Sequence, residues 1–338
     1  MLAKSLILAV VLAASTTQAW WCTGHMTVAW IAKQTMSSTA YEAVNSIATS
    51  LSAAGPFPQS PDFVQMACWA DDLKSQGLEP MAGWHFINQV YDPSNYPVAQ
   101  WPIQDENVEV LITQLDKTLK ERVKSHTPAW DIAFALANLV HFYGDIHQPL
   151  HCAELFSSTY TTGDRGGNDQ SVTVDGTTTK LHFVWDSVCW EYNQELTRPL
   201  STSDYATVQT FGQYLQNTYT FTSSQMKEWN STVMAQESLQ DAIQYAYPGT
   251  YNGMTISSAY LATCKPVAEG RVALAGYRLG NELEFLFGSS QTFDKLDEEA
   301  QGALAKKVRE RVIRHIVRLE NTKAERRAEI LAMRQQKQ

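Results

Sequence analysis

Apolar residues recur at helical spacing along most of the chain, and this pattern predicts a mainly α-helical protein. Residues 26–36 and 106–124 place apolar side chains three and four positions apart, as on one face of a helix. Residues 128–145 are apolar nearly all round, which predicts a buried helix that Pro149 ends or bends. Further helices are expected at 38–51, 182–194, 203–216, 235–246 and 263–287.

Two stretches interrupt the helical pattern. Residues 55–62, GPFPQSPD, are expected to form a loop. Within 170–183, the alternation in QSVTVDGTTTKLHF predicts a small β-hairpin whose turn is Asp175-Gly176. The expected fold class is therefore all-α, with one small β-hairpin.

The two ends of the chain differ from its body. Residues 1–19 combine Lys4, an apolar run and a small-residue site at Ala19, as secretory signal peptides do, so cleavage would leave Trp20 as the N-terminus. No later apolar run is long enough for a transmembrane segment. Residues 291–338 predict a charged helical tail that packs on the body, forms a coiled coil or projects into solvent. Residues 20–290 form the expected domain.

Composition and charge narrow the function. The chain is 44% hydrophobic and 18% charged, as in globular proteins, and its net charge of −9 suits a passive nucleic-acid binder poorly. The acidic excess is less puzzling if carboxylates hold divalent cations. Five cysteines predict one or two disulfides and at least one remaining thiol, with the pairing left open. Asn230 begins the N-glycosylation sequon NST.

Histidines and carboxylates recur at a spacing that favours metal binding. His141 and Asp145 are four residues apart, and His182 and Asp186 repeat that spacing, so each pair shares one helix face. One such pair is more often a surface ion pair, whereas two pairs, with His151 after the first, favour a borderline metal such as zinc. Asp71 and His85 lie among aromatic residues. They are either further ligands or a helix-cap carboxylate and a packed core histidine.

In their combined order these residues resemble the zinc-dependent nuclease S1/P1 family, which is related to the zinc-dependent phospholipases C. The resemblance is carried by seven motifs: Trp20 with His25, WAD at 69–71, HFI at 85–87, HFYGD at 141–145, QPLH at 148–151, GGN at 166–168 and LHFVWD at 181–186. It implies a phospholipase C/P1 nuclease-like fold with three zinc ions per chain in a cleft.

The resemblance also implies a ligand set for each zinc ion. The first would be held by Asp71, His85, His141 and Asp145, the second by His151, His182 and Asp186, and the third by the amine and carbonyl of Trp20 with His25 and Asp145. The third site would need signal cleavage, because only a free α-amine can be a ligand.

The implied reaction is hydrolysis of the P–O3′ bond of single-stranded DNA and RNA by metal-activated water, with Asp71 and Asp145 in the catalytic centre. Many family members also remove the 3′-phosphate from 3′-nucleotides, which makes these a second expected substrate. No stable protein partner is expected. The signal peptide directs the chain to secretion or to a lysosome-like compartment.

Four neighbouring positions complete the expected site: Lys74 and Asn88 are expected to act in catalysis, and Phe86, Asn168 and Lys74 in substrate binding. Lys74 stands where fungal members have Arg, and Asn88 stands where they have the Asp that orients the attacking water. Lys lacks the bidentate fork of Arg, and Asn cannot take a proton. Phe86 is either a stacking surface for a base or a core residue. Asn168 is either a substrate contact or a turn residue.

Two other functions compete with this one. A zinc phospholipase C would share the fold, but its last ligand motif is His-x-x-x-Glu and this chain has His-x-x-x-Asp. A secreted zinc-binding protein without activity is the other alternative, and Asn88 is the feature that favours it.

Overall fold

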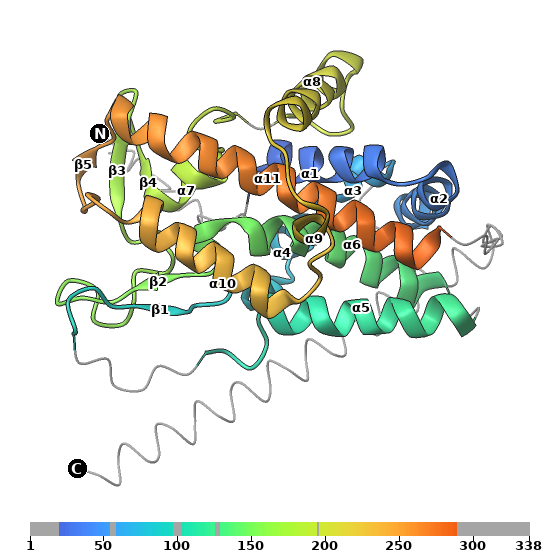
Figure 1. Ribbon diagram of the computed structural model, residues 1–338, viewed down its shortest axis with the longest axis horizontal. Coiled ribbons are helices and arrows are strands. Elements are labelled where there is room, and N and C mark those ends of the chain that lie inside the picture. Colours follow the sequence, from blue (N-terminus) through green and yellow to red (C-terminus); the bar gives the residue numbers. More distant parts are fainter. Residues whose placement is uncertain (1–19, 55–58, 97–102, 126–128, 195, 289–338) are drawn as a thin grey trace, which may run out of the picture.

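A long C-terminal helix and the short N-terminal helix pack along each other and organise the molecule (Figure 1). The computed structural model describes residues 20–288 except 55–58, 97–102, 126–128 and 195. The expected signal peptide, the charged tail and half of the 55–62 loop therefore lie outside the described residues.

The described residues are mainly helical, as the hydrophobic pattern predicts. The helices are α1 (Cys22–Thr35), α2 (Ser38–Ala54), α3 (Phe63–Met66), α4 (Trp69–Ser75), η1 (Glu79–His85), α5 (Val108–Ser125), α6 (Ala129–His147), η2 (Pro149–His151), α7 (Leu181–Asp186), α8 (Thr202–Thr218), α9 (Ser223–Met226), α10 (Ser231–Asp241), η3 (Ala242–Ala246) and α11 (Ser258–Phe287).

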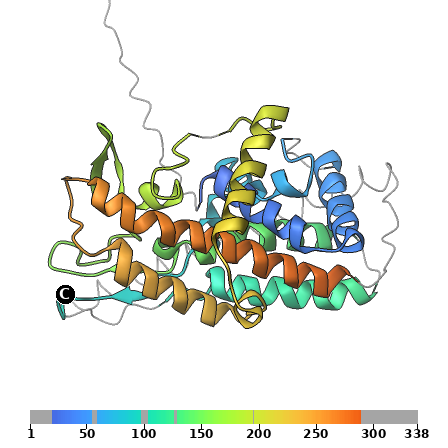
Figure 2. The same ribbon diagram turned by 45° about the horizontal axis from the view of Figure 1, so that its top comes forward.

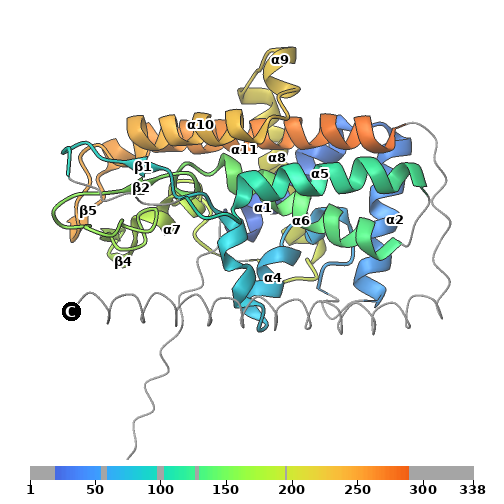
Figure 3. The same ribbon diagram turned by 90° about the horizontal axis from the view of Figure 1, so that it is seen from below.

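Small residues on α11 allow it to lie close to α1. A Cβ atom added at Gly276 would be 2.5 Å from Cβ of Ile31, and one added at Gly280 would be 2.6 Å from Cβ of Thr35. Buried α6 packs against α5, α11 and α1. Figure 3 shows α10 and α11 forming one layer with α5 beneath it, and Figure 2 shows α8 crossing α1 and α11. The central position of α6 matters because it carries two of the expected ligands.

Short strands gather at one end of the molecule. β3 (Ser171–Val174) and β4 (Thr177–Lys180) pair antiparallel, which confirms the predicted hairpin. Asp175 and Gly176 both have positive φ, at 48° and 77°, as the favoured two-residue hairpin turn requires. Three strands were not predicted: β1 (Val90–Tyr91) pairs parallel with β2 (Glu154–Leu155), and β5 (Met254–Thr255) pairs parallel with β3.

Two disulfides join segments that are distant in the sequence. Within the described residues, Cys22 pairs with Cys68 and Cys189 pairs with Cys264, while Cys152 is a buried free thiol. The count of two disulfides and one thiol agrees with the prediction, and disulfides of this kind persist in oxidising compartments. The first disulfide ties the start of α1 to the residue before α4.

Two predicted helices have different limits in the structure. The helix expected at 182–194 ends at Asp186, because Val188, Cys189 and Trp190 all adopt left-handed backbone conformations. The helix expected at 235–246 begins at Ser231 and changes to a π-helical turn at Ala242. Across the described helices, none combines the length and apolar character needed to cross a membrane.

Candidate metal centre

Three helices and the end of a 3-10 turn bring five expected ligands together. His141 and Asp145 project from neighbouring turns of α6, with His141 Nε2 3.3 Å from Asp145 Oδ2. His85, the last residue of η1, places Nδ1 2.9 Å from Asp145 Oδ2. His25 on α1 lies 3.3 Å from Asp145 Oδ1 and stacks on His141. Asp71 on α4 lies 3.7 Å from both His85 and His141.

A second group forms where α7 meets η2. His182 and Asp186 occupy successive turns of α7, with Nε2 of His182 3.5 Å from Oδ2 of Asp186. His151 closes η2, and its Nε2 lies 3.1 Å from Nε2 of His182 and 3.9 Å from Asp186 Oδ1. Gln148 donates a hydrogen bond to Asp186 Oδ1. Pro149 thus ends α6 and lets the chain carry His151 to this group.

Backbone carbonyl groups fix the orientation of three of these imidazoles. The hydrogen bonds run from His141 Nδ1 to the carbonyl of Ala67 (2.6 Å), from His151 Nδ1 to that of His85 (2.7 Å) and from His182 Nδ1 to that of Gly166 (2.6 Å). A carbonyl oxygen can only accept, so each Nδ1 carries a proton and, in a neutral ring, each Nε2 presents its lone pair. Metal-binding histidines are held in this way.

The residues fit bound cations. The Nε2 atoms of His151 and His182 face each other at 3.1 Å, and two lone pairs at that distance repel unless a cation lies between or beside them. Within the described residues, Oδ2 of Asp71 and Oδ2 of Asp186 are buried and accept no hydrogen bond. Imidazole nitrogen and carboxylate oxygen together are the donors that zinc takes. Three sets of ligand atoms lie close enough to hold an ion: His25, Asp71 and His141; His85, His141 and Asp145; His151, His182 and Asp186.

The electrostatics prepare the histidines and two carboxylates for this role. Burial lowers the pKa of His25 and of His85 to about 4, and burial also lowers the pKa of His151 and His182, so these rings are neutral near pH 7. Burial opposes ionisation of Asp71, but the ammonium group of Lys74 and the nearby histidines hold its pKa below the usual value.

The pKa values of His141, Asp145 and Asp186 need separate accounts. His141 is the exception among the histidines, because Asp145 and Asp71 outweigh its burial and raise its pKa. Despite burial, His141 and His85 hold the pKa of Asp145 well below its usual value. Burial raises the pKa of Asp186, and a cation beside this carboxyl group would lower it again.

Trp20 lies at the start of the described chain, beside the second group. Its side chain is fully buried, and Gly24 leaves room for it, because a Cβ added there would be 2.7 Å from Cβ of Trp20. The amide of Trp21 donates to the carbonyl of Asp186 at 2.9 Å. The residue pair at the head of α1 is therefore fixed against the C-terminal end of α7.

The four positions considered for substrate binding have different surroundings. Lys74 is buried, and its Nζ lies 2.8 Å from Asp71 Oδ1. Asn168 donates to the carbonyl of Arg165 and is mostly buried, as a turn residue would be. Phe86 and Asn88 follow His85 in an extended segment, and both are half-buried. In the described part of the chain, the side chains of Phe86 and Asn88 make no hydrogen bond, ion pair or ring stack with a ligand group.

Sequence reasoning missed residues that position the ligands. Gly144 lies under the ring of His25, because a Cβ there would be 2.4 Å from His25 Nδ1. Gly166 has φ of +61° and provides the carbonyl that orients His182. Asp164 holds the same loop by accepting from the amides of Leu155 and Gly167. Two signals were visible in the sequence. Gly144 lies inside an apolar helix, where glycine lowers helix stability unless it has a packing role, and Gly166 belongs to the GGN motif.

Known nucleases are similar to this chain in sequence. The family model "S1/P1 Nuclease" matches residues 20–288. Endonuclease 4 of Arabidopsis thaliana is 27% identical over 296 residues, covering 80% of this chain and 90% of its own length. Nuclease S1 of Aspergillus oryzae is 27% identical over 290 residues, covering 81% and 93%. Nuclease P1 of Penicillium citrinum is 31% identical over 170 residues, covering 50% and 57%.

The family match spans the described body, including both His-x-x-x-Asp pairs and the motifs between them. With the helical fold and the His/Asp groups that can hold metal ions, it leads to one conclusion. This chain belongs to the S1/P1 nuclease family, and it is a hydrolase that acts on phosphodiester bonds of nucleic acids.

Proposed function

We propose that this chain is a zinc-dependent endonuclease that hydrolyses P–O3′ bonds of single-stranded DNA and RNA and releases 5′-phosphorylated products. The same centre is proposed to remove the 3′-phosphate from 3′-nucleotides. The observation that carries the proposal is the pair of Nε2 lone pairs of His151 and His182 at 3.1 Å, each fixed by a backbone carbonyl. A cation bound by both nitrogens relieves the repulsion between these lone pairs.

The residues proposed to hold zinc form three sets around Asp145 and Asp186. Asp71, His85, His141 and Asp145 hold one ion, His151, His182 and Asp186 hold a second, and His25 with Asp145 and the backbone of Trp20 holds a third. His25 shares a ligand group with His141 and Asp71, which supports its place beside the first set. When bound, clustered zinc ions lower the pKa of water and neutralise charge on phosphate oxygens.

The chain's own residues prepare the site for a phosphodiester. Burial keeps His25, His85, His151 and His182 neutral, so these four need not lose a proton to bind a cation. Backbone carbonyls orient the rings of His141, His151 and His182. Lys74 supplies positive charge next to Asp71, although its ammonium is a point charge without the fork of Arg. Phe86 offers a half-buried ring for base stacking, and single strands favour such stacking.

Asn88 can orient the attacking water but cannot act as a base. Its amide can orient a water molecule through a hydrogen bond, but it cannot accept the proton that the water loses. The lowered pKa values of Asp71 and Asp145 keep both carboxylates ionised, as metal ligands must be, and make them weak proton acceptors. These two residues are the proposed catalytic carboxylates, while Asn168 on the glycine loop is a proposed substrate contact.

We further propose that residues 1–19 are removed as a signal peptide, that residues 20–290 form the catalytic domain and that residues 291–338 form a helical tail. Secretion, or delivery to a lysosome-like compartment, agrees with the two disulfides. Removal of residues 1–19 would expose the amine of Trp20, which then becomes available as a ligand.

The test combines N-terminal sequencing with zinc quantification on the purified secreted chain. We expect a first residue of Trp20 and three zinc ions per chain. A variant with one alanine inserted before Trp20 should hold one zinc ion fewer and lose most activity, because the new terminal amine is displaced by a residue. An N-terminus at another residue with full zinc content would contradict the role of Trp20.

The substrate is tested separately on single-stranded DNA, single-stranded RNA, 3′-AMP and phosphatidylcholine. We expect cleavage of both nucleic acids and no release of phosphocholine. Release of phosphocholine without cleavage of DNA would favour the phospholipase alternative. Zinc binding with no hydrolysis that depends on His141 would favour the binding protein without activity.

A further inference from the structure

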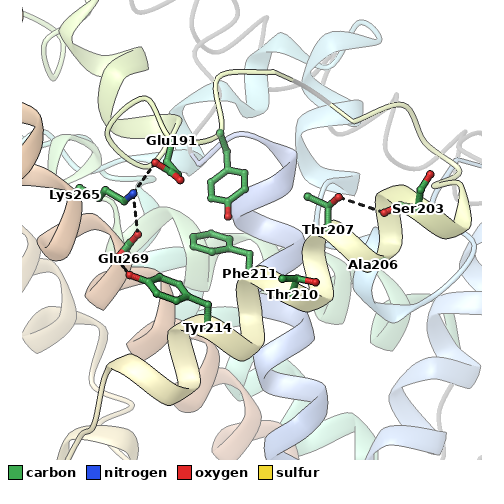
Figure 4. A pocket seen from close by; sticks show the side chains of 10 residues that line it. Glu191, Ser203, Ala206, Thr207, Thr210, Phe211, Tyr214, Lys265 and Glu269 are labelled. Carbon is green, nitrogen blue, oxygen red and sulfur yellow. Dashed lines mark hydrogen bonds and ion pairs between the residues drawn. The ribbon is translucent and has the colours of Figure 1, made fainter.

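A surface hollow of about 640 Å³ lies beside α8, and none of its lining residues belongs to the two ligand groups (Figure 4). α8 forms one wall with Thr210, Phe211 and Tyr214. α11 contributes Lys265 and Glu269, and the segment after α7 contributes Glu191 and Tyr192. The volume is within the range of about 300–1,000 Å³ that small-molecule pockets occupy.

Three aromatic rings line the hollow. The rings of Tyr192 and Phe211 have centroids 4.1 Å apart and are tilted by 36°, and Phe211 and Tyr214 lie 6.5 Å apart and nearly parallel. Phe211 is 3% exposed and lies against Tyr192, whereas Tyr214 is 46% exposed. The hollow therefore offers the ring of Tyr214 to a ligand that has an apolar face of its own.

Charged groups at one end of the hollow are already paired with each other. Lys265 Nζ lies 2.6 Å from Glu191 Oε2 and 3.9 Å from Glu269 Oε1 (Figure 4). Glu269 is buried and also accepts hydrogen bonds from the hydroxyls of Tyr214 and Tyr219. Two carboxylates against one ammonium repel a phosphate, so this end suits neither a nucleotide nor a nucleic-acid backbone.

Unused hydrogen-bonding groups complete the lining. In the part of the chain that the structure describes, the hydroxyls of Tyr192 and Thr210 have no hydrogen-bond partner. Glu191 uses one carboxylate oxygen for Lys265, which leaves the other available as an acceptor. The hollow thus combines ring faces with separate donors and acceptors around them.

A disulfide joins two of the segments that line the hollow. Val188, Cys189 and Trp190 adopt left-handed backbone conformations with φ of 54°, 53° and 70°. Such conformations are unfavourable for residues other than glycine and persist only where the surroundings enforce them. The disulfide between Cys189 and Cys264 enforces this turn, and it joins the segment that carries Glu191 to the helix that carries Lys265.

We propose that this hollow binds a neutral saccharide of one or two rings. A pyranose has one face of C–H groups, which packs on an aromatic ring, and a rim of hydroxyls that donate to carboxylates and exchange hydrogen bonds with tyrosine and threonine. The exposed ring of Tyr214, the second carboxylate oxygen of Glu191 and the hydroxyls of Tyr192 and Thr210 match these two features. The site is independent of the proposed zinc centre and of the nuclease activity.

The experiment is saturation-transfer difference NMR on the full secreted chain. The probes are maltose, cellobiose, lactose and N,N′-diacetylchitobiose, with 5′-AMP and spermidine as the anionic and cationic comparisons. We expect transfer to the ring C–H protons of at least one disaccharide. Thr210→Arg places a long cation across the hollow and should abolish that transfer, whereas Gln209→Arg, on an exposed position of α8 outside the hollow, should retain it.

Each outcome decides the proposal. Transfer to a disaccharide that is lost in T210R and kept in Q209R supports it, provided both variants have the melting temperature of the parent. Absence of transfer to all four disaccharides overturns it. Equal transfer in T210R and the parent also overturns it, because the sugar would then bind elsewhere. Transfer to 5′-AMP or spermidine alone, sensitive to T210R, would assign the hollow to a charged ligand instead.

Discussion

Replacing Gly144 with alanine should remove one metal ion, although alanine favours helices. Gly→Ala inside a helix normally stabilises a protein by about 0.5–1 kcal/mol. Here the new Cβ would lie 2.4 Å from His25 Nδ1 and 2.7 Å from Cε1, whereas ordinary van der Waals contact begins near 3.4 Å. The imidazole must therefore move by about 1 Å, while a metal–ligand distance tolerates only about 0.2 Å.

The ring of His25 has little room for this movement. It is fully buried, and its centroid lies 3.8 Å from that of His141 in a stacked arrangement. Overpacking in such a place costs about 1–3 kcal/mol, which offsets or exceeds the gain in helix propensity. Displacing a ligand should also lower metal affinity or activity by about 10- to 100-fold, as changes beside metal ligands do.

The assay is zinc content per chain by mass spectrometry, together with the melting temperature. G144A should hold one zinc ion fewer than the parent and melt at the same or a lower temperature. Gly270→Ala on α11 is the matched control, because its new Cβ makes only ordinary contacts, 3.6 Å from Tyr219, and should raise the melting temperature. The reasoning is refuted if G144A keeps the parent zinc content and gains stability as G270A does.

Three further predictions test the frame around the site. Asp164→Ala removes a buried carboxylate that accepts hydrogen bonds from two backbone amides, a glutamine side chain and a tyrosine hydroxyl. The variant should lose about 3–5 kcal/mol of stability in urea unfolding and should bind less zinc. A loss under about 1 kcal/mol would contradict the role of its loop. Replacing both Cys22 and Cys68 with serine removes a disulfide that spans 46 residues and should lower the free energy of unfolding by about 4 kcal/mol. Mass spectrometry first checks that the disulfide is formed in the parent, and an unchanged urea midpoint would then argue against this bridge. After chelation, the contribution of His25 and His85 to stability should fall as the pH drops from 6.5 to about 4, because the unfolded chain binds protons that these buried rings do not bind until about pH 4. His141 and Asp186 act in the opposite direction, so the measurement compares urea midpoints of the parent and of His25→Gln, and an equal fall in both would contradict a buried, neutral His25.

Regular periodicity made the long helices and the ligand pairs predictable. His141 and Asp145, and His182 and Asp186, could be placed on one helix face from their spacing alone, and both pairs lie on helices as expected. The hairpin was predictable for a similar reason, because Asp175-Gly176 specifies its turn chemically. These features depend on residues near each other in the sequence.

The supporting contacts could not be predicted, because they join distant backbone atoms. The carbonyls that orient His141, His151 and His182 belong to residues whose side chains carry no signal of that role. The helix expected beyond Asp186 was wrong for a related reason. Its residues suit a helix, but the Ser187 hydroxyl accepts from the amide of Trp190 and Cys189 is drawn into a disulfide with Cys264. Tertiary partners decided that backbone.

The most direct test of the central claim is the cleavage of a single-stranded oligonucleotide by the secreted chain before chelation, after chelation and after zinc is restored, with the product ends identified. The account predicts loss of cleavage on chelation, recovery with zinc, and products that carry a 5′-phosphate and a free 3′-hydroxyl. Cleavage that persists in the chelated protein, or products that carry a 3′-phosphate, would contradict it.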